Sequence, residues 1–403
     1  MATALEANPG VTAARLRYEA MLERPEQESA FPDPMVMWTY MIEHVETANG
    51  PSENMLEVSQ EIPYSGKRKL RSEVSRLEAE VAERAWRTAE LDVAFRVRAA
   101  HYDIFRVDAS LAIVEQEAEV LDRLERVARG RYATGAASQS DVLRVQTERS
   151  RIEERVLMLR REREDAAAMF NEAMSRPQGA AVGRVTVPPE PEIDLPADDV
   201  LFALARERRP EVDEARRMVE TEEMRARLAR RDFYPDFRVG LQWNQIGVSH
   251  NPNAPDPGQD SWAVTLGVSV PLHRSWRHAQ VREAETMASA AEREAGDRGN
   301  TAEAQVRSVL AAVRMQRDLT ALFDSTLIPQ AEATMRAAEV AYENGAGDFL
   351  SVLDSERSLL TLRLGRAVAQ AELGRSLAAL DRAVGTDPRE RLHAGLAPER
   401  SAS

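Results

Sequence analysis

An internal duplication limits what this chain can fold into more than any other feature of its sequence. Four blocks occur in the same order in each half, at nearly constant spacing. The pairs are NPGVTAAR with RPEVDEAR, FPDPMV with YPDFRV, EIPYSGKRKLR with SVPLHRSWRHA, and RYATGAASQSDVLRVQ with AYENGAGDFLSVLDSE. Chance similarity would not preserve the order of four blocks, so the chain is expected to contain two copies of one structural unit. The repeat is far longer than the units of about 20–45 residues that build solenoids.

The duplication divides the chain into two repeats, residues 1–176 and 209–385, which are joined by a linker at 177–208. Each repeat is expected to contain a helix, two strands and a long helical hairpin. Residues 175–199 are rich in proline and glycine, which predicts little regular structure there. The apolar periodicity ends after Gly385, so residues 386–403 are predicted to form a disordered tail.

Each repeat contains two segments in which apolar and polar residues alternate, as in a strand with one apolar face. The segments are residues 35–44, 54–62, 236–246 and 261–270. A tilted strand of about ten residues is long enough to cross a bilayer, and apolar-out alternation with aromatic residues near the strand ends suits a membrane barrel. The residues predicted to face lipid are Val36, Trp38, Tyr40, Phe237, Val239, Leu241, Trp243, Trp262, Val264, Leu266 and Val268.

A water-soluble arrangement is the alternative for these strands, either as a β-sandwich or as amphipathic hairpins packed on helices. Four strands cannot close a barrel, and an open sheet leaves unpaired backbone groups at its two edges. If the strands enter lipid, several copies of the chain must therefore contribute strands to one closed barrel.

Long helices are predicted to follow the strands of each repeat. Residues 67–131 contain no proline, and their apolar residues recur at the three- and four-residue steps of a coiled-coil seam. A kink or reset is expected near Pro329, because proline lacks the backbone donor that a helix needs. Helices of this length are equally typical of a soluble coiled-coil scaffold. The further helices are expected at 138–176, 276–344 and 348–384.

Two short segments, residues 131–138 and 342–348, are expected to form the tips that join antiparallel helices. A glycine in each tip can adopt a positive φ and end the first helix. A serine or aspartate then offers an N-cap oxygen to the second helix, and a tyrosine packs against the turn. These residues are Tyr132, Gly135 and Ser138 in the first tip and Tyr342, Gly345 and Asp348 in the second.

Composition and the lack of known motifs argue against several classes of function. The formal charge of −14 argues against general binding of nucleic acid. The chain has no cysteine, so disulfides, thiol nucleophiles and a lipid-bearing cysteine are excluded. It contains no His-Glu-x-x-His, Gly-x-Ser-x-Gly or P-loop pattern, and its histidines and methionines form no cluster with metal-ligand spacing. The protein is therefore not expected to be an enzyme or to hold a metal or cofactor.

The beginning of the chain does not look like a secretory signal. The segment MATALEANPG lacks a basic region followed by an apolar one. Either the protein is cytosolic, or the chain begins after a signal that has been removed. No run of eighteen apolar residues is present, so no transmembrane helix is expected.

The ordered set of blocks resembles the TolC-type outer-membrane efflux channel family, also called outer membrane factors. The resemblance covers residues 8–385 and includes the duplicated RPEV and YPDF blocks, EIPYSGKR, the two tips and LDRAVG near the end. It implies a mainly α-helical fold with β structure, in which long antiparallel coiled-coil helices form an α-barrel. It also implies a homotrimer whose copies each give four strands to a twelve-stranded β-barrel in outer-membrane lipid, with the helices in the periplasm.

The resemblance further implies an exit channel for small molecules or metal cations. The substrate would come from an inner-membrane pump through a periplasmic adaptor protein, and the tips would meet the adaptor. The block EIPYSGKR resembles the branch that exports metal cations. The competing interpretation is a soluble coiled-coil scaffold or interaction protein without transport activity, which explains the helices but neither the strands nor the duplication.

In this family, aspartates after the second tip line the periplasmic constriction in an Asp-Val-Leu-Asp pattern. The chain has Ser351 at the first aspartate position and Asp354 at the second. The resemblance therefore implies one ring of carboxylates in a trimer instead of two, and weaker trapping of cations. Asp141 occupies the comparable position of the first repeat and is expected to add charge or contacts between helices.

Overall fold

The computed structural model describes residues 1–185, 195–250, 253 and 255–386, which form two compact units. The sheet unit consists of Arg15–Arg84 and Asp213–Asp297, and the hairpin unit consists of Met1–Ala14, Ala85–Val212 and Arg298–Ser403. Each unit takes segments from both repeats, so the structural division does not follow the boundary between the repeats. Residues 387–403 of the predicted tail, and residues 186–194 of the predicted linker, lie outside the described residues.

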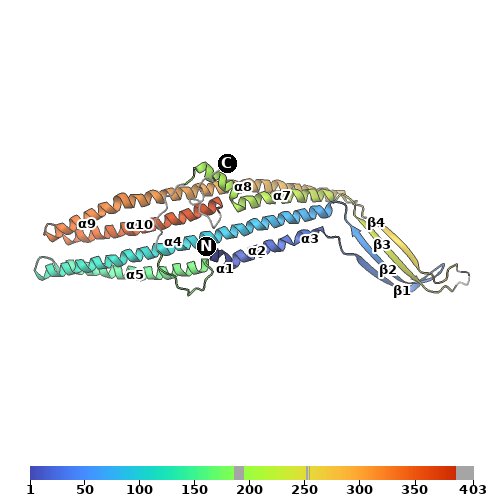
Figure 1. Cartoon of the computed structure of the whole chain (residues 1–403), viewed down its shortest axis with the longest axis horizontal. Helices are drawn as coiled ribbons and strands as arrows, with labels where there is room; N and C mark the ends of the chain where they lie inside the picture. Colours follow the sequence, from blue (N-terminus) through green and yellow to red (C-terminus); the bar gives the residue numbers. More distant parts are fainter. Residues whose placement is uncertain (186–194, 251–252, 254, 387–403) are drawn as a thin grey trace, which may run out of the picture. The chain divides into compact units, whose positions relative to one another are not determined.

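The sheet unit contains one antiparallel sheet in the order β1-β2-β3-β4 (Figure 1). The β2–β3 pair joins a strand of the first repeat to a strand of the second. The first hairpin is longer than predicted because its ladder continues to the Thr47–Gly50 pair. The last strand ends earlier than predicted, three residues before Pro271, which has no backbone donor for a ladder. The strands are β1 Met35–Thr47, β2 Gly50–Ile62, β3 Phe237–Ile246 and β4 Ser261–Val268.

A buried lysine holds the base of the sheet to the helix that follows β2. Lys67 begins α4 (Lys67–Ala133), and its Nζ lies 2.9 Å from Oδ1 of Asp236. The same carboxylate oxygen accepts the backbone N–H of Tyr64 at 2.7 Å, and the rings of Tyr64 and Tyr234 stack with centroids 4.6 Å apart. The PYSGK block of one repeat and the YPDF block of the other therefore meet here, directly before β3.

Ion pairs join the helices of the sheet unit. Glu78 of α4 pairs with Arg225 of α7, and Arg230 of α7 pairs with Glu285 of α8, each at 2.5 Å. The helices α2 and α3 precede β1 in the chain. The bounds of these helices are α2 Pro9–Leu22, α3 Arg24–Ser29, α7 Pro210–Arg231 and α8 Arg274–Leu322.

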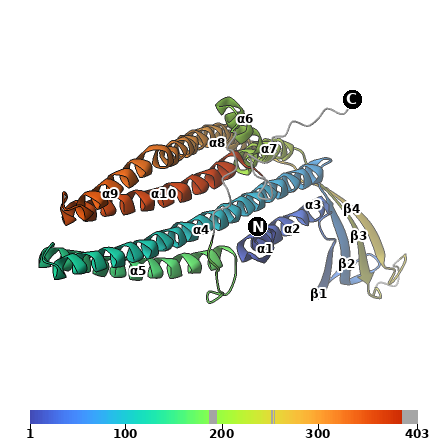
Figure 2. The ribbon, with the colours of Figure 1, turned by 60° about the vertical axis from the view of Figure 1, so that its left-hand side comes forward.

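The hairpin unit contains two long antiparallel helical hairpins (Figure 2). In the first, α4 is followed by α5 (Gln139–Ala173), and in the second, α9 (Ile328–Glu343) is followed by α10 (Phe349–Val384). A π-helical turn at Phe323–Leu327 separates α8 from α9, and Pro329 lies in the first turn of α9. The predicted reset near Pro329 takes this form, because proline cannot donate the hydrogen bond that would continue the α-helical ladder.

The described residues of 175–199 contain no regular structure before Asp198, as expected, and the last part of the linker, 198–208, is helical. The helix α6 (Asp198–Arg208) has two aspartates in its first turn and arginines in its last turn, as the helix dipole favours. Its Leu201 and Ala205 are fully buried against Val306 and Leu380. Burial of this apolar side stabilises a helix that the proline- and glycine-rich sequence before it does not suggest.

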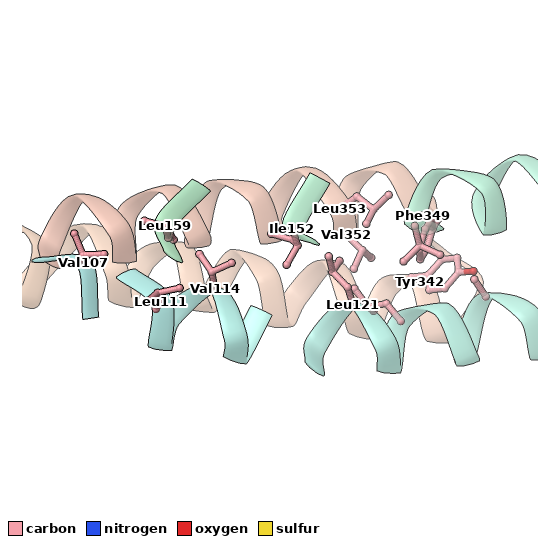
Figure 3. Close-up of a cluster of buried hydrophobic side chains, with 13 residues drawn as sticks. Val107, Leu111, Val114, Leu121, Ile152, Leu159, Tyr342, Phe349, Val352 and Leu353 are labelled. Carbon is pink, nitrogen blue, oxygen red and sulfur yellow. The ribbon is translucent and has the colours of Figure 1, made fainter. Parts of the chain in front are cut away.

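The main core of the hairpin unit lies between the two hairpins near their tips (Figure 3). The core includes Ile152 and Leu159 of α5, which are both buried. A smaller cluster at the other end of the unit covers α1 (Ala2–Ala7) with Val93 and Val97 of α4. The labelled residues of the main core are Val107, Leu111, Val114, Leu121, Ile152, Leu159, Tyr342, Phe349, Val352 and Leu353.

Candidate functional site

One face of the sheet is apolar across all four strands and exposed to solvent in the single chain. The exposed fraction reaches 71% at Val264 and 76% at Leu266, both in β4. The strand register places the apolar residues of neighbouring strands opposite one another, so they form continuous rows. Two such rows are Val36, Val58, Leu241 and Val264, and Trp38, Leu56, Trp243 and Trp262.

All the residues predicted to face lipid lie on this apolar face. They are exposed apart from Trp243, which is half-buried. The ring Nε1 of Trp243 donates to Oδ2 of Asp260 at 3.0 Å, which satisfies the polar atom of this side chain. The remaining side chains present hydrocarbon and aromatic surface far in excess of what a water-soluble sheet normally exposes.

The opposite face of the sheet is mainly polar. Glu57 lies opposite Gln242, and Ser59 lies opposite Gly240, whose lack of a side chain leaves room for the Glu57 carboxylate. Apolar residues on this face include Met37 of β1 and Met55 of β2. The sheet is a single layer, so one of its faces is apolar and the other is mainly polar.

Both edges of this sheet lack a neighbouring strand within the described part of the chain. The outer strands are β1 and β4, and each is paired on one side only. The strands alternate in direction, so β4 of one chain is oriented to pair antiparallel with β1 of another. Addition of such neighbours would satisfy the backbone donors and acceptors of both edges.

The tips of the two hairpins adopt the local geometry predicted from their sequences. Gly135 and Gly345 have φ of 74° and 70°, in the left-handed region that glycine favours. Asp348 caps α10 by accepting the N–H of Ser351 at 2.7 Å. In the first tip Ser138 is the N-cap residue of α5, and its own N–H donates to Asp141 at 3.1 Å.

The two tips also lie against each other and line an open hollow of about 580 Å³. Arg131 of the first hairpin donates from Nη1 to the carbonyl oxygens of Tyr342 and Glu343, at 2.8 and 3.1 Å. Its guanidinium also lies over the ring of Tyr342, with 4.6 Å between Cζ and the ring centroid. Asp141 and Asp348 contribute acidic groups to the lining of this hollow.

The tyrosines of the two tips occupy different environments, although the repeats align them. Tyr132 is 50% exposed, whereas Tyr342 is 6% exposed and packs against Phe349 at a centroid distance of 5.2 Å. Tyr342 therefore does not fit the predicted role of a direct adaptor contact, because its side chain belongs to the core. The side chain of Tyr132 remains exposed at the first tip.

The residues predicted to form a constriction lie on two helices. Asp354 and Ser351 are exposed on α10, and Oδ1 of Asp354 lies 3.1 Å from Nη1 of Arg357. Arg357 also forms an ion pair with Glu148 of α5, which ties the second hairpin to the first. Asp141 accepts a hydrogen bond from the backbone N–H of Ser138 at the start of α5. It lines the hollow between the tips, whereas Asp354 does not.

Sequence reasoning missed Arg131 and Arg357 as connections between the hairpins. Both arginines lie near a predicted site residue in the sequence. Arg131 directly precedes Tyr132, and Arg357 follows Asp354 by three residues. Their partners, Tyr342 and Glu148, lie about two hundred residues away in the chain. No spacing rule within one hairpin points to such partners.

The described residues also limit other kinds of site. Among them no three histidine or acidic side chains are grouped so as to hold a metal ion. None of the helices within the described ranges combines the length and the apolar character that a membrane-spanning helix requires.

A family model described as Outer membrane efflux protein matches residues 1–174 and 201–386. The chain belongs to this family. The outer membrane efflux protein family consists of transport channels, so the chain is an outer-membrane efflux channel protein and not an enzyme. The resemblance inferred from the duplicated blocks is thereby confirmed. No match was found among curated proteins.

Solved structures of outer-membrane channels share the fold of this efflux protein. The CusC channel matches with a TM-score of 0.81 and 18% identity over 95% of this chain and 90% of its own. VceC from Vibrio cholerae gives a TM-score of 0.77 and 18% identity, with 95% and 94% of the two chains covered. The open-state MtrE channel from Neisseria gonorrhoeae gives 0.75 and 17%, with 95% and 87% covered. The predicted fold of long helices with four strands is confirmed by these matches.

Proposed function

We propose that three copies of this efflux protein close into one outer-membrane exit channel, with four strands from each copy in a twelve-stranded β-barrel. The observation that carries this proposal is the sheet with one continuous apolar face and two unpaired edges. In lipid, every backbone donor and acceptor must be paired within protein, so an open four-stranded sheet is not a stable membrane structure. Pairing β4 of each copy with β1 of the next removes all edges.

The two faces of the sheet fit the two environments of such a barrel. The face that carries Val264 and Leu266 would contact lipid, and the face that carries Glu57 and Gln242 would line the lumen. A polar lumen allows hydrated solutes to pass, as in other membrane barrels. The helices of the hairpin unit would continue the passage as an α-barrel in the periplasm.

The tips would meet a periplasmic adaptor protein, which connects the channel to an inner-membrane pump. Support comes from polar residues that line the hollow between the tips, among them Ser138 and Asp348. Tyr132 adds an exposed aromatic side chain at the first tip. Gly135 and Gly345 would keep both turns compact at this surface. The substrates would be small molecules or metal cations, delivered by the pump through the adaptor.

Conductance of the purified protein tests this proposal. Detergent-purified full-length protein should migrate with the mass of three chains and should give stepwise conductance in a planar bilayer. Each step should persist after the protein in the aqueous phase has been washed out, because the barrel is embedded in lipid. A water-soluble single chain without conductance would support the soluble coiled-coil scaffold instead.

Asp354 is proposed to place one ring of three carboxylates at the periplasmic constriction. Replacing it with alanine is expected to weaken block of the channel by multivalent cations on the order of tenfold. The reason is that the substitution removes all three negative charges of the ring at the constriction. Block is measured as the cation concentration that halves single-channel current. Asp318→Ala is the matched control, since Asp318 is an exposed acidic residue of α8. Unchanged block in Asp354→Ala, or an equal loss in both variants, would remove Asp354 from this role.

A further inference from the structure

Two carboxyl groups meet in the core between the hairpins and have no part in the channel function proposed above. Glu117 of α4 is 5% exposed and Glu356 of α10 is 2% exposed. Their helical neighbours, Val114 and Leu121 of α4 and Val352 and Leu353 of α10, pack in one buried core. Within this core Glu356 is near enough to Glu117 for its charge and a side-chain hydrogen bond to raise the pKa of Glu117. An ionised carboxylate only accepts hydrogen bonds, so two facing carboxyl groups can bond to each other only when one of them carries a proton. A direct hydrogen bond between Glu117 and Glu356 therefore requires a bound proton.

Nearby cations do not neutralise this pair directly. The cation that acts on Glu117 is Arg363 of α10, but its Nη2 lies 2.9 Å from Oε1 of Glu332 on α9. Oε2 of Glu356 is buried and has no hydrogen-bond partner within the described residues. For Glu117, burial penalises the negative charge and raises the pKa of its carboxyl group.

Further charges face the pair from α9. Glu339 of α9 is close enough to Glu356 for burial and the Glu356 charge to raise the pKa of Glu339, with Glu343 adding to the effect. The opposing cation at this point is Arg123 of α4. The negative charges thus outnumber the cations around Glu356 on this side.

The charges on α5 are engaged with partners of their own. Glu148 of α5 forms ion pairs with Arg357 of α10 and with Arg151 of its own helix. Arg149 of α5 is paired with Asp122 and Glu125 of α4. The Glu148–Arg357 pair joins the two hairpins without any bound proton, in contrast to the Glu117–Glu356 contact. The other pairs lie within the first hairpin.

We propose that Glu117 and Glu356 form a proton-dependent clasp between the α4–α5 hairpin and the α9–α10 hairpin. With the hairpins together, the pair shares one proton across a buried hydrogen bond. With the hairpins locally apart, water solvates both carboxylates, and the shared proton leaves. Protons therefore bind the closed arrangement more tightly than the open one and hold the hairpins together.

The pH range of this effect follows from the proton affinities of the two states. Burial, together with the charge and the hydrogen bond of Glu356, raises the pKa of Glu117 from 4.5 to about 8. The clasp is fully effective below the ordinary value of 4.5 and weakens as the pH rises towards about 8. One proton changes the ratio of closed to open forms by about tenfold per pH unit across this range. Above it both states have lost the proton, so the ratio becomes constant.

Hydrogen exchange of the full-length protein in detergent, followed by mass spectrometry, tests the clasp. Exchange is measured from pH 5 to 9 and corrected for the pH dependence of chemical exchange. In the wild type, peptides that cover residues 111–121 and 349–360 should lose protection by about tenfold per pH unit up to about pH 8. Peptides from the sheet unit should not show this slope.

Glu117→Gln is expected to remove the pH dependence of hydrogen-exchange protection in these peptides, because an amide donates to Glu356 at every pH and binds no proton. Glu356→Gln is the reciprocal variant and should remove it as well, so the result does not depend on one variant alone. Glu119→Gln is the matched control, since it removes the same charge from an exposed position two residues along α4 and should retain the wild-type slope.

A flat profile in the wild type would overturn the clasp, and so would an equal loss of slope in Glu119→Gln. Both measurements concern local opening of the folded chain. They give the same result whether or not the protein conducts, so failure of the clasp and failure of the proposed channel are distinguishable.

Discussion

Replacing Val264 with arginine is expected to prevent assembly of the protein in a membrane, whereas the same replacement at the next residue is tolerated. Val264 is 71% exposed on the apolar face, in the middle of β4. Arginine on the lipid face of a barrel costs about 2–4 kcal/mol near the bilayer midplane. A trimer carries this cost three times, which is comparable to the total stability of many folded proteins.

Thr265 provides the control, because it lies beside Val264 and points to the polar face. Thr265→Arg adds the same charge to a surface that would contact water in the lumen. The measurement is the fraction of each variant that folds into liposomes as a three-chain species. Equal insertion of both variants would show that the apolar face does not contact lipid.

Removing the carboxylate of Asp236 is expected to lower the free energy of unfolding of the sheet unit by about 3–5 kcal/mol, because a buried lysine loses its closest counter-charge. Lys67 is 3% exposed, and Asp236 lies 2.9 Å from its Nζ. Partial burial by itself would raise the pKa of Asp236, but hydrogen bonds from Lys67 and Tyr64 and the charge of Lys67 lower it overall. The stabilisation is therefore present at neutral pH and is lost only as the pH falls below about 3.8.

Unfolding of Asp236→Ala in urea is followed by tryptophan fluorescence. Four of the five tryptophans lie in the sheet unit, so this signal reports mainly on its unfolding. Asp232→Ala is the comparison, because Asp232 is 3.8 Å from Lys67 and partly exposed. It is expected to lose about 1 kcal/mol or less. If both variants lost the same small amount, the Lys67–Asp236 pair would not be what fixes the base of the sheet.

The sequence predicted the elements of the fold because their patterns are local. The alternation from Phe237 to Trp243 requires only a period of two, and the turn at Gly345 requires only a positive φ. The duplication added long-range information, since it indicated that both repeats supply the same kinds of element. The helix α6 was missed because its apolar residues, Leu201 and Ala205, are few and find their partners at the far end of the chain.

The arrangement of the candidate site depended on contacts that the sequence does not encode locally. The repeats align Tyr132 with Tyr342, but only the structure shows that one is exposed and the other buried. The clasp could not be predicted either. Glu117 and Glu356 are two of many acidic residues on long charged helices, and nothing in their spacing separates them from exposed ones.

In the proposed channel, the outer strands of neighbouring copies pair to close one barrel. The chain has no cysteine, so a series of variants with one cysteine in β1 and one in β4 can report this pairing without background. After mild oxidation of the membrane-embedded protein, gel electrophoresis under denaturing conditions without reductant measures the covalent products. Barrel closure predicts disulfides between chains at one strand register, with a closed three-chain product. Cross-links only within single chains, or none at any register, would contradict it.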